Sequence, residues 1–246
     1  MASGLRVERH DDVASTNTLA FERARSGDPG DLWIIAQDQS SGRGRRGRQW
    51  ASMRGNLFAS YLMLNPGPRS RIGELPLVAA VSLAEAIDKC AGTHQMVGLK
   101  WPNDLLVDGA KLSGILLEAE TVSSEQIALV LGFGVNCVQH PKQGLYPTVD
   151  LAALGYRITA EDLFGSLALS LGNWLEHWRQ PQGFEVVRKA WLARAIHLGK
   201  IIKVRNGDRE MSGTFLDLDD RGHMILGLEN GQRETILAGD VFIEGS

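Results

Sequence analysis

The chain has little cysteine: 2 residues among 246, Cys90 and Cys137, without the paired spacing of a zinc site or a redox motif. We interpret both as small buried side chains. The chain also lacks an N-terminal apolar run of signal-peptide length, and no stretch approaches the roughly 20 apolar residues that span a bilayer. These absences exclude a disulfide-bonded scaffold and a transmembrane helix, and they predict a cytoplasmic protein.

An excess of positive charge is missing as well. Lys and Arg number 26 against 29 Asp and Glu, so the formal net charge is -3. A protein whose whole surface neutralises a phosphate backbone would be basic, and this class is therefore disfavoured. Hydrophobic residues make up 43% and charged residues 22%, which is ordinary globular usage and excludes a disordered or fibrous chain. Any positive charge that matters for function must be local.

Periodicity and turn residues divide the first 195 residues into helices and strands. Apolar-periodic segments follow the polar side chains of Ser15 and Thr159 and the proline at position 76, as at helix N-termini, and Asp162 stands in the capping-box position. The predicted helices cover 15–24, 77–91, 159–178 and 184–195, and the predicted strands cover 32–37, 56–64, 97–101, 114–120 and 128–136. The close spacing of the later strands favours antiparallel hairpins, so we expect an α+β domain with a mixed β-sheet backed by helices.

The pattern changes after Gly199. The remaining segment alternates apolar and polar residues and is cut by turn signals at Asn206-Gly207, Arg221-Gly222 and Asn230-Gly231. We expect a small all-β barrel there. The predicted domains are therefore 1–195 and 196–246.

The segment GRGRRGR from Gly42 to Arg48 is the most informative one. Its four guanidinium groups in a glycine-rich loop are typical of a flexible anion clamp. The segment also contains a G-x-G-x-x-G pattern, but the residues that follow are a poor helix start, which disfavours a dinucleotide site. A basic nucleic-acid patch and a solvated, mobile loop are the other interpretations.

A second group of polar residues lies in KWPNDLLVDGAKLSGILLE, from Lys100 to Glu118. Lys100 and Lys111 flank a turn that begins with Asn103 and Asp104. Taken singly, PND is an ordinary turn and Lys111 is an ordinary strand-edge lysine. Their combination with the arginine loop is what suggests a site.

The order of STN (15–17), Gln39, GRGRRGR, KWPND, Lys111 and GFGVN (132–136) closely resembles the biotin–protein ligase family, over nearly the whole chain. Lipoate ligases share the general fold but not the arginine loop. The resemblance implies a catalytic domain like that of class II aminoacyl-tRNA synthetases, followed by an SH3-like barrel. It also implies an enzyme that uses ATP with Mg²⁺ to convert biotin to biotinyl-5'-AMP. The biotin then passes to a lysine of a biotin carboxyl carrier protein.

The resemblance also carries roles to individual residues. The implied biotin contacts are Ser15, Thr16, Asn17, Gln39, Gly42, Arg43, Gly44, Arg45, Lys111 and Gly114. The implied ATP contacts are Arg45, Arg46, Arg48, Trp50, Lys100, Asn103, Lys111 and Asn136. The implied catalytic residues are Lys111, Arg43, Arg45 and Asp104. Asp104 is a candidate proton acceptor or Mg²⁺ ligand, although a turn-capping aspartate is an alternative. We expect Arg43→Ala to let the adenylate escape.

Several alternatives stay open at this point. About fourteen residues precede the STN segment, too few for a helix-turn-helix domain, so we expect no repressor role and no DNA partner. A lipoate or octanoate transferase of similar fold is the alternative enzyme. A nucleic-acid-binding module that uses the arginine loop is the alternative from another class. Both a monomer and a homodimer are compatible with the sequence.

Overall fold

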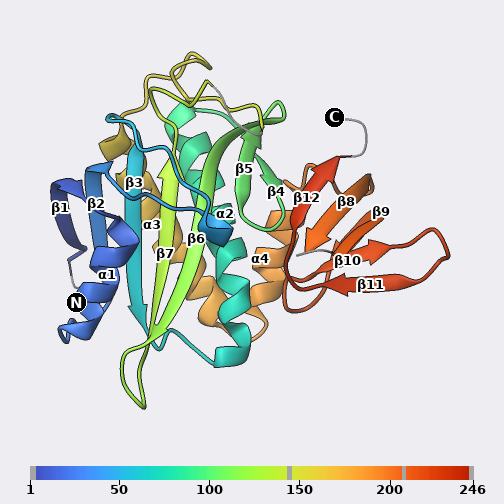
Figure 1. The fold of residues 1–246 in the computed structure, drawn as a ribbon, viewed down its shortest axis with the longest axis horizontal. Helices are drawn as coiled ribbons and strands as arrows, with labels where there is room; N and C mark the ends of the chain where they lie inside the picture. Colours follow the sequence, from blue (N-terminus) through green and yellow to red (C-terminus); the bar gives the residue numbers. More distant parts are fainter. Residues whose placement is uncertain (1–3, 143–145, 207–208, 244–246) are drawn as a thin grey trace.

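The computed structural model describes residues 4–142, 146–206 and 209–243, which form a large and a small β-sheet with associated helices (Figure 1). The seven-stranded sheet has the order β1-β2-β3-β7-β6-β5-β4. Its strands are β1 (Arg6–Val13), β2 (Leu32–Gln39), β3 (Leu57–Leu64), β4 (Gly98–Lys100), β5 (Asp104–Val107), β6 (Ala110–Thr121) and β7 (Ile127–Val135). Only the β1–β2 pair of this sheet is parallel, so the expected mixed sheet with antiparallel hairpins is confirmed.

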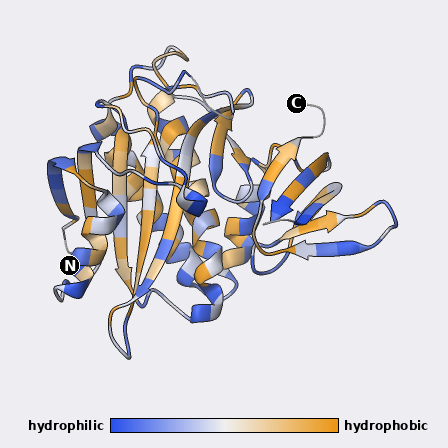
Figure 2. Ribbon diagram, viewed as in Figure 1, coloured by the Kyte–Doolittle hydropathy of each residue, from blue (hydrophilic) through white to orange (hydrophobic). Residues whose placement is uncertain are grey.

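Helices cover both faces of this sheet. The four α-helices of the described residues are α1 (Thr16–Arg25), α2 (Leu75–Ala91), α3 (Ala160–Arg179) and α4 (Gly183–Leu192). On one face, Phe21 of α1 packs in a small apolar cluster with Ile34 and Val130. On the other face, Trp33 contacts Phe164 of α3 at a ring-centroid distance of 5.3 Å. Figure 2 shows hydrophobic residues concentrated in the central strands and in the helix surfaces beside them.

The ends of the predicted helices follow from local chemistry. Thr159 precedes α3 and its Oγ1 accepts a hydrogen bond from the Asp162 backbone N–H at 3.1 Å, as predicted. Gly92 ends α2 in a left-handed conformation with φ of 64°, which glycine adopts without steric cost. None of the helices in the described ranges is long and apolar enough to cross a membrane.

Some sequence predictions were wrong in detail. Strand β1 was missed because its residues are mostly polar, none of them is buried, and it forms an edge of the sheet. Strand β5 was missed because it has only four residues between two turns. Helix α4 ends at Leu192 rather than Ala195, because Ala195 instead forms a bridge with Leu99 of β4. Cys137 is buried as expected, whereas Cys90 is only partly buried.

The C-terminal segment forms the small antiparallel β-unit that the sequence predicted. Its strands are β8 (Ile201–Asn206), β9 (Arg209–Leu218), β10 (Met224–Gly227), β11 (Arg233–Ile236) and β12 (Asp240–Ile243), in the order β11-β10-β9-β8-β12. The turn glycines Gly222 and Gly231 both have φ of 80°. Gly207, of the predicted Asn206-Gly207 turn, lies outside the described residues. A domain boundary at residue 195 stays a prediction.

The two sheets are joined through β4. The backbone N–H of Leu99 donates to the Arg194 carbonyl at 2.8 Å, and that of Ile196 donates to the Leu99 carbonyl at 3.1 Å. The indole N–H of Trp101 donates to the Gly222 carbonyl at 3.2 Å. His197 is buried at this junction, and among the described residues its Nδ1 has no hydrogen-bond partner. Burial, with the nearby ammonium groups of two lysines, lowers the pKa of His197 to about 4.

This buried histidine predicts a pH dependence of stability. The unfolded chain, with a histidine pKa of about 6.5, binds the proton more tightly than the folded chain, so stability is complete above pH 6.5 and falls toward pH 4. Between pH 7 and 4.5 we expect His197 alone to lower the free energy of unfolding by about 2–3 kcal/mol. Urea unfolding at both pH values should show that the free energy of unfolding falls less in His197→Phe than in the wild type. An equal loss in both proteins would contradict the prediction.

Candidate active site

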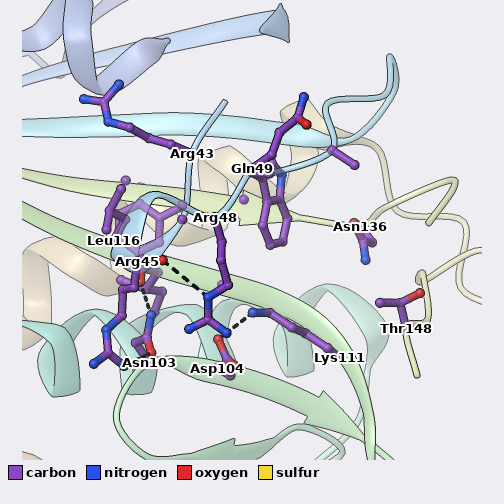
Figure 3. A pocket seen from close by; sticks show the side chains of 18 of the residues that line it. Arg43, Arg45, Arg48, Gln49, Asn103, Asp104, Lys111, Leu116, Asn136 and Thr148 are labelled. Atoms are coloured by element: carbon purple, nitrogen blue, oxygen red, sulfur yellow. Dashed lines mark hydrogen bonds and ion pairs between the residues drawn. The ribbon is translucent and has the colours of Figure 1, made fainter. Parts of the chain in front are cut away.

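A cavity of about 320 Å³ lies against β6 and β7 and is lined in part by the segment that connects β2 to β3 (Figure 3). Of the residues that the sequence assigned to the site, only Gly42 and Arg46 do not line it. Arg43 and Lys111, which are far apart in sequence, share this one cavity. The lining residues that the sequence did not single out include Gln49, Ala51, Ile115, Leu116, Pro141, Tyr146, Thr148, Asp240 and Val241.

Glycines form the part of the cavity wall that lies on the sheet. Gly114 of β6 and Gly134 of β7 are cross-strand partners, and Trp50 from the loop lies over both. A Cβ atom on Gly134 would lie 2.5 Å from Trp50 Cε2. A Cβ on Gly132 would collide with the side-chain amide of Asn17. The motif GFGVN is thus explained by strand alternation, because its glycines face the cavity while Phe133 faces the Trp33 core.

A hydrogen-bonded polar network forms one end of the cavity at the N-terminus of α1. Thr16 donates from its backbone N–H and its hydroxyl to Gln39 Oε1, at 2.9 and 3.1 Å. Ser60 Oγ lies 2.7 Å from Thr16 Oγ1 and 2.5 Å from Asn17 Oδ1. Ser15, Thr16 and Asn17 are each no more than 4% exposed. Ser60 was missed because it is a single hydroxyl in an apolar strand, a pattern that carries no functional signal.

Arg43 belongs to this polar end. Its Nε and Nη2 each donate to Glu118 at 3.0 Å, and its Nη1 donates to Thr18 at 2.8 Å. The Asn17 amide also donates to Glu118, at 2.7 Å. Figure 3 shows the Arg43 guanidinium directed away from Lys111. The arginines of the loop therefore do not all converge on one point, because Arg43 pairs with Glu118 near the polar network.

The other end of the cavity gathers cations around a carboxylate. Lys111 Nζ lies 2.7 Å from Asp104 Oδ1, and Arg45 Nη1 donates to Asn103 Oδ1 at 3.0 Å (Figure 3). Desolvation lowers the pKa of Arg45, although the carboxylates of Asp104 and Asp240 oppose this shift. An arginine remains charged nevertheless, so the guanidinium is a poorly hydrated cation beside the cavity.

Lys100 lies at the same end, on the side of the C-terminal unit. Its Nζ is 4.9 Å from the ring centroid of Tyr146 and 6.0 Å from that of Phe242. Burial lowers the pKa of Lys100, and the neighbouring Lys111 lowers it further, whereas Asp104 raises it. The Lys100 ammonium therefore holds its proton less tightly than the ammonium of an exposed lysine does.

Trp50 and Asn136 lie between the two ends. The Trp50 indole has Lys111 Nζ 5.7 Å from its ring centroid, and in the part of the chain that the structure describes its buried Nε1 has no partner. Asn136 is buried and donates to the Val149 carbonyl at 3.1 Å. An unpartnered buried donor costs free energy, so this indole N–H is an unsatisfied polar group in the cavity wall.

The donor set fits a metal ion that arrives with a nucleotide. The described residues hold no group of three or more His, Cys, Asp or Glu side chains that could bind a metal by themselves. Asp104 and Asp240 do line the cavity. Mg²⁺ that is carried by phosphates commonly uses only one or two protein carboxylates.

The cavity thus has a glycine wall, a polar network at one end and cations at the other. The sequence matches the Biotin/lipoate A/B protein ligase family over residues 11–136 and the Biotin protein ligase C terminal domain over residues 197–243. The chain belongs to the biotin/lipoate A/B protein ligase family, and the family and fold that the sequence predicted are confirmed.

Individual relatives agree with this assignment. The chain is 37% identical to a biotin–[acetyl-CoA-carboxylase] ligase of Paracoccus denitrificans, over 94% of this chain and 98% of the relative. It is 32% identical to the enzyme of that name from Mycobacterium tuberculosis, over 93% and 85% of the two chains. The solved biotin protein ligase of Aquifex aeolicus in complex with biotin and ATP superimposes with a TM-score of 0.81, at 25% identity over 96% and 97% of the chains.

Proposed function

We propose that this protein is a biotin–protein ligase that activates biotin with ATP and transfers it to the ε-amine of a lysine on a carrier protein. The observation that supports this most directly is the single cavity in which the Ser15–Asn17 network and the Lys111–Asp104 pair stand at opposite ends. The ligases of Paracoccus and Mycobacterium carry this activity in their names, and the Aquifex enzyme binds both biotin and ATP.

Biotin would lie along the glycine wall. Its ring system would meet the hydroxyl and amide groups of Thr16, Asn17 and Gln39, which already form a buried network. Its carboxylate would reach Lys111 and Arg45. Gly44 lines the cavity next to Arg45, and Gly42 lies next to Gln39. Because neither glycine has a side chain, both keep space for the ligand.

In the first half-reaction a biotin carboxylate oxygen attacks the α-phosphorus of ATP. A P–O bond to biotin forms, the bond to the β-phosphate breaks, and pyrophosphate leaves. Two anions must approach each other, so cations are needed to cancel their repulsion. Lys111, Arg45 and Arg48 would supply them, and Trp50, Lys100, Asn103 and Asn136 would contact the nucleotide. Mg²⁺ bound to ATP would neutralise further phosphate charge.

The second half-reaction needs a neutral amine. A normal lysine with a pKa of ~10.4 is neutral at pH 7 in roughly one of 10³ to 10⁴ molecules. The amine nitrogen of the acceptor attacks the acyl carbon, AMP leaves, and a proton must be accepted. Asp104 lies 2.7 Å from Lys111 at the cationic end and is the carboxylate that we assign as the proton acceptor.

The acceptor we propose is a biotin carboxyl carrier protein or domain, as the names of the relatives suggest. We propose no DNA partner, and the protein would act as a monomer or a homodimer.

A labelling assay tests the proposed function. Purified protein, ATP, Mg²⁺, biotin and a carrier domain should give a mass increase on one lysine of the carrier. Isothermal titration with biotin and with lipoate, side by side, separates this function from lipoate or octanoate transfer. Labelling with lipoate but not with biotin would overturn the proposal. Salt-dependent retardation of single-stranded RNA or DNA without any labelling would favour a nucleic-acid-binding protein instead.

A further inference from the structure

Asp240 belongs to the C-terminal unit, yet its side chain lines the cavity of the catalytic domain. Its Oδ2 accepts a hydrogen bond from Arg46 Nη1 at 2.9 Å, and its Oδ1 accepts one from Arg48 Nη2 at 2.7 Å. The carboxylate is only 19% exposed. One partly buried anion from the second sheet thus binds two cations of the arginine loop.

The same edge of the C-terminal unit makes further contacts with the loop. Arg46 Nη2 donates to Asn206 Oδ1 of β8 at 3.3 Å, and Arg45 Nη2 donates to the Gly239 carbonyl at 3.3 Å. Three of the four loop arginines therefore contact this unit. Arg43, by contrast, pairs with Glu118 of β6.

The loop itself is compact, so a constraint on one part is transmitted to the rest. The Gly44 N–H donates to the Arg48 carbonyl at 2.7 Å, and the Trp50 N–H donates to the Gly42 carbonyl at 2.9 Å. Arg46 adopts a left-handed conformation with φ of 57°, which non-glycine residues adopt at a cost. Its ion pair with Asp240 offsets that cost, and an ordered loop then keeps Arg45 and Arg48 beside the cavity.

Single exposed ion pairs contribute little, because water screens them and the side chains lose freedom. This case differs, since one carboxylate receives two guanidinium groups from one compact loop and is itself mostly buried. Burial lowers the pKa of Arg48, but the hydrogen bond to Asp240, the charge of Asp240 and the nearby Tyr146 and Asp104 together outweigh it, and the net shift is upward.

We propose that Asp240 is a positioning residue, which fixes the arginine loop to the C-terminal unit and so closes the loop over the bound adenylate. The effect on the adenylate rests on the proposed ligase function, whereas the contact between Asp240 and the arginine loop does not. It gives the C-terminal unit a defined role, because this unit holds the loop whose cations face the phosphates. Loss of the carboxylate should loosen the loop first and release the adenylate as a result.

The test compares Asp240→Asn with Asp217→Asn. Asp217 of β9 also joins the C-terminal unit to the rest of the chain, through an ion pair with Arg188 of α4 at 2.6 Å, but it does not line the cavity. Hydrogen exchange of the full-length protein without ligand is measured for the amides of residues 42–50. We expect Asp240→Asn to speed this exchange by about tenfold, the effect of losing one charge-assisted hydrogen bond, and Asp217→Asn to leave it unchanged. Asp240→Glu should restore most of the protection.

The second readout is escape of biotinyl-adenylate from the enzyme, measured after rapid separation of the protein from free ligand. Asp240→Asn should release it several-fold faster, while the rate of adenylate formation falls less. Unchanged loop exchange in Asp240→Asn, or equal acceleration in both asparagine variants, would overturn the positioning role. Because hydrogen exchange needs no substrate, a loosened loop in a protein that makes no adenylate would refute the ligase function alone.

Discussion

Lys111→Ala is expected to slow the formation of biotinyl-adenylate by about 10²- to 10³-fold, the usual effect of removing one charged group that stabilises a transition state. The lysine is the cation nearest to Asp104, at 2.7 Å, and it faces the cavity beside Trp50. Its removal deletes a positive charge and leaves the Asp104 carboxylate without its ion-pair partner where two anions must meet. Single-turnover measurement of adenylate formation with saturating biotin and ATP gives the rate.

Biotin affinity separates catalysis from simple binding in this variant. We expect the dissociation constant for biotin, measured by titration calorimetry, to change by less than the rate does, because most contacts to the ring system lie at the other end of the cavity. Lys189→Ala, which removes an exposed lysine paired with Glu185 on α4, is the matched control and should behave as the wild type. Equal losses in rate and affinity would show that Lys111 only binds biotin.

Gly134→Val is expected to weaken biotin binding by about 10- to 100-fold, corresponding to about 1–3 kcal/mol of overpacking. An added Cβ would lie 2.5 to 2.8 Å from three atoms of the Trp50 indole. The backbone of β7 cannot yield, because β3 and β6 pair with it on both sides. Trp50 must therefore move, and the new side chain takes space along the glycine wall.

The control for this variant is Gly172→Val on α3, where an added Cβ meets nothing within 4 Å. Both proteins should retain the same far-ultraviolet circular dichroism, and only Gly134→Val should lose affinity for biotin in calorimetric titration. If Gly134→Val binds biotin as tightly as the wild type, the glycine wall is not the biotin surface.

The positions of most elements could be predicted because their signals are local. The capping of α3 by Thr159, the end of α2 at Gly92 and the turn glycines of the second sheet each depend on a few neighbouring residues. Strand β1 could not be predicted in this way. Its polar residues form a strand because β2 offers a parallel partner at the sheet edge, and that partner is not adjacent in sequence.

In the candidate site, too, local features could be predicted and contacts between residues distant in sequence could not. Nearly all of the residues that the motifs assigned to the site do line the cavity, because GRGRRGR, KWPND and GFGVN are short segments whose residues act together. The direction of each arginine was not predictable. Arg43 pairs with Glu118, 75 positions away, and Arg48 pairs with Asp240, 192 positions away. Glu118 ends the segment that begins at Lys100, and Asp240 lies in no motif, but nothing in the local pattern indicated which arginine either acid would contact.

The sequence by itself indicated the family through its motifs, and it determined most of the helices and strands and the presence of a cationic loop, because propensity, capping and alternation act over a few residues. The tertiary structure decided which acid each arginine meets and that Asp240 of the second sheet lines the cavity of the first. Such pairs depend on the register of distant strands and on the docking of the two sheets, and only the folded chain fixes both.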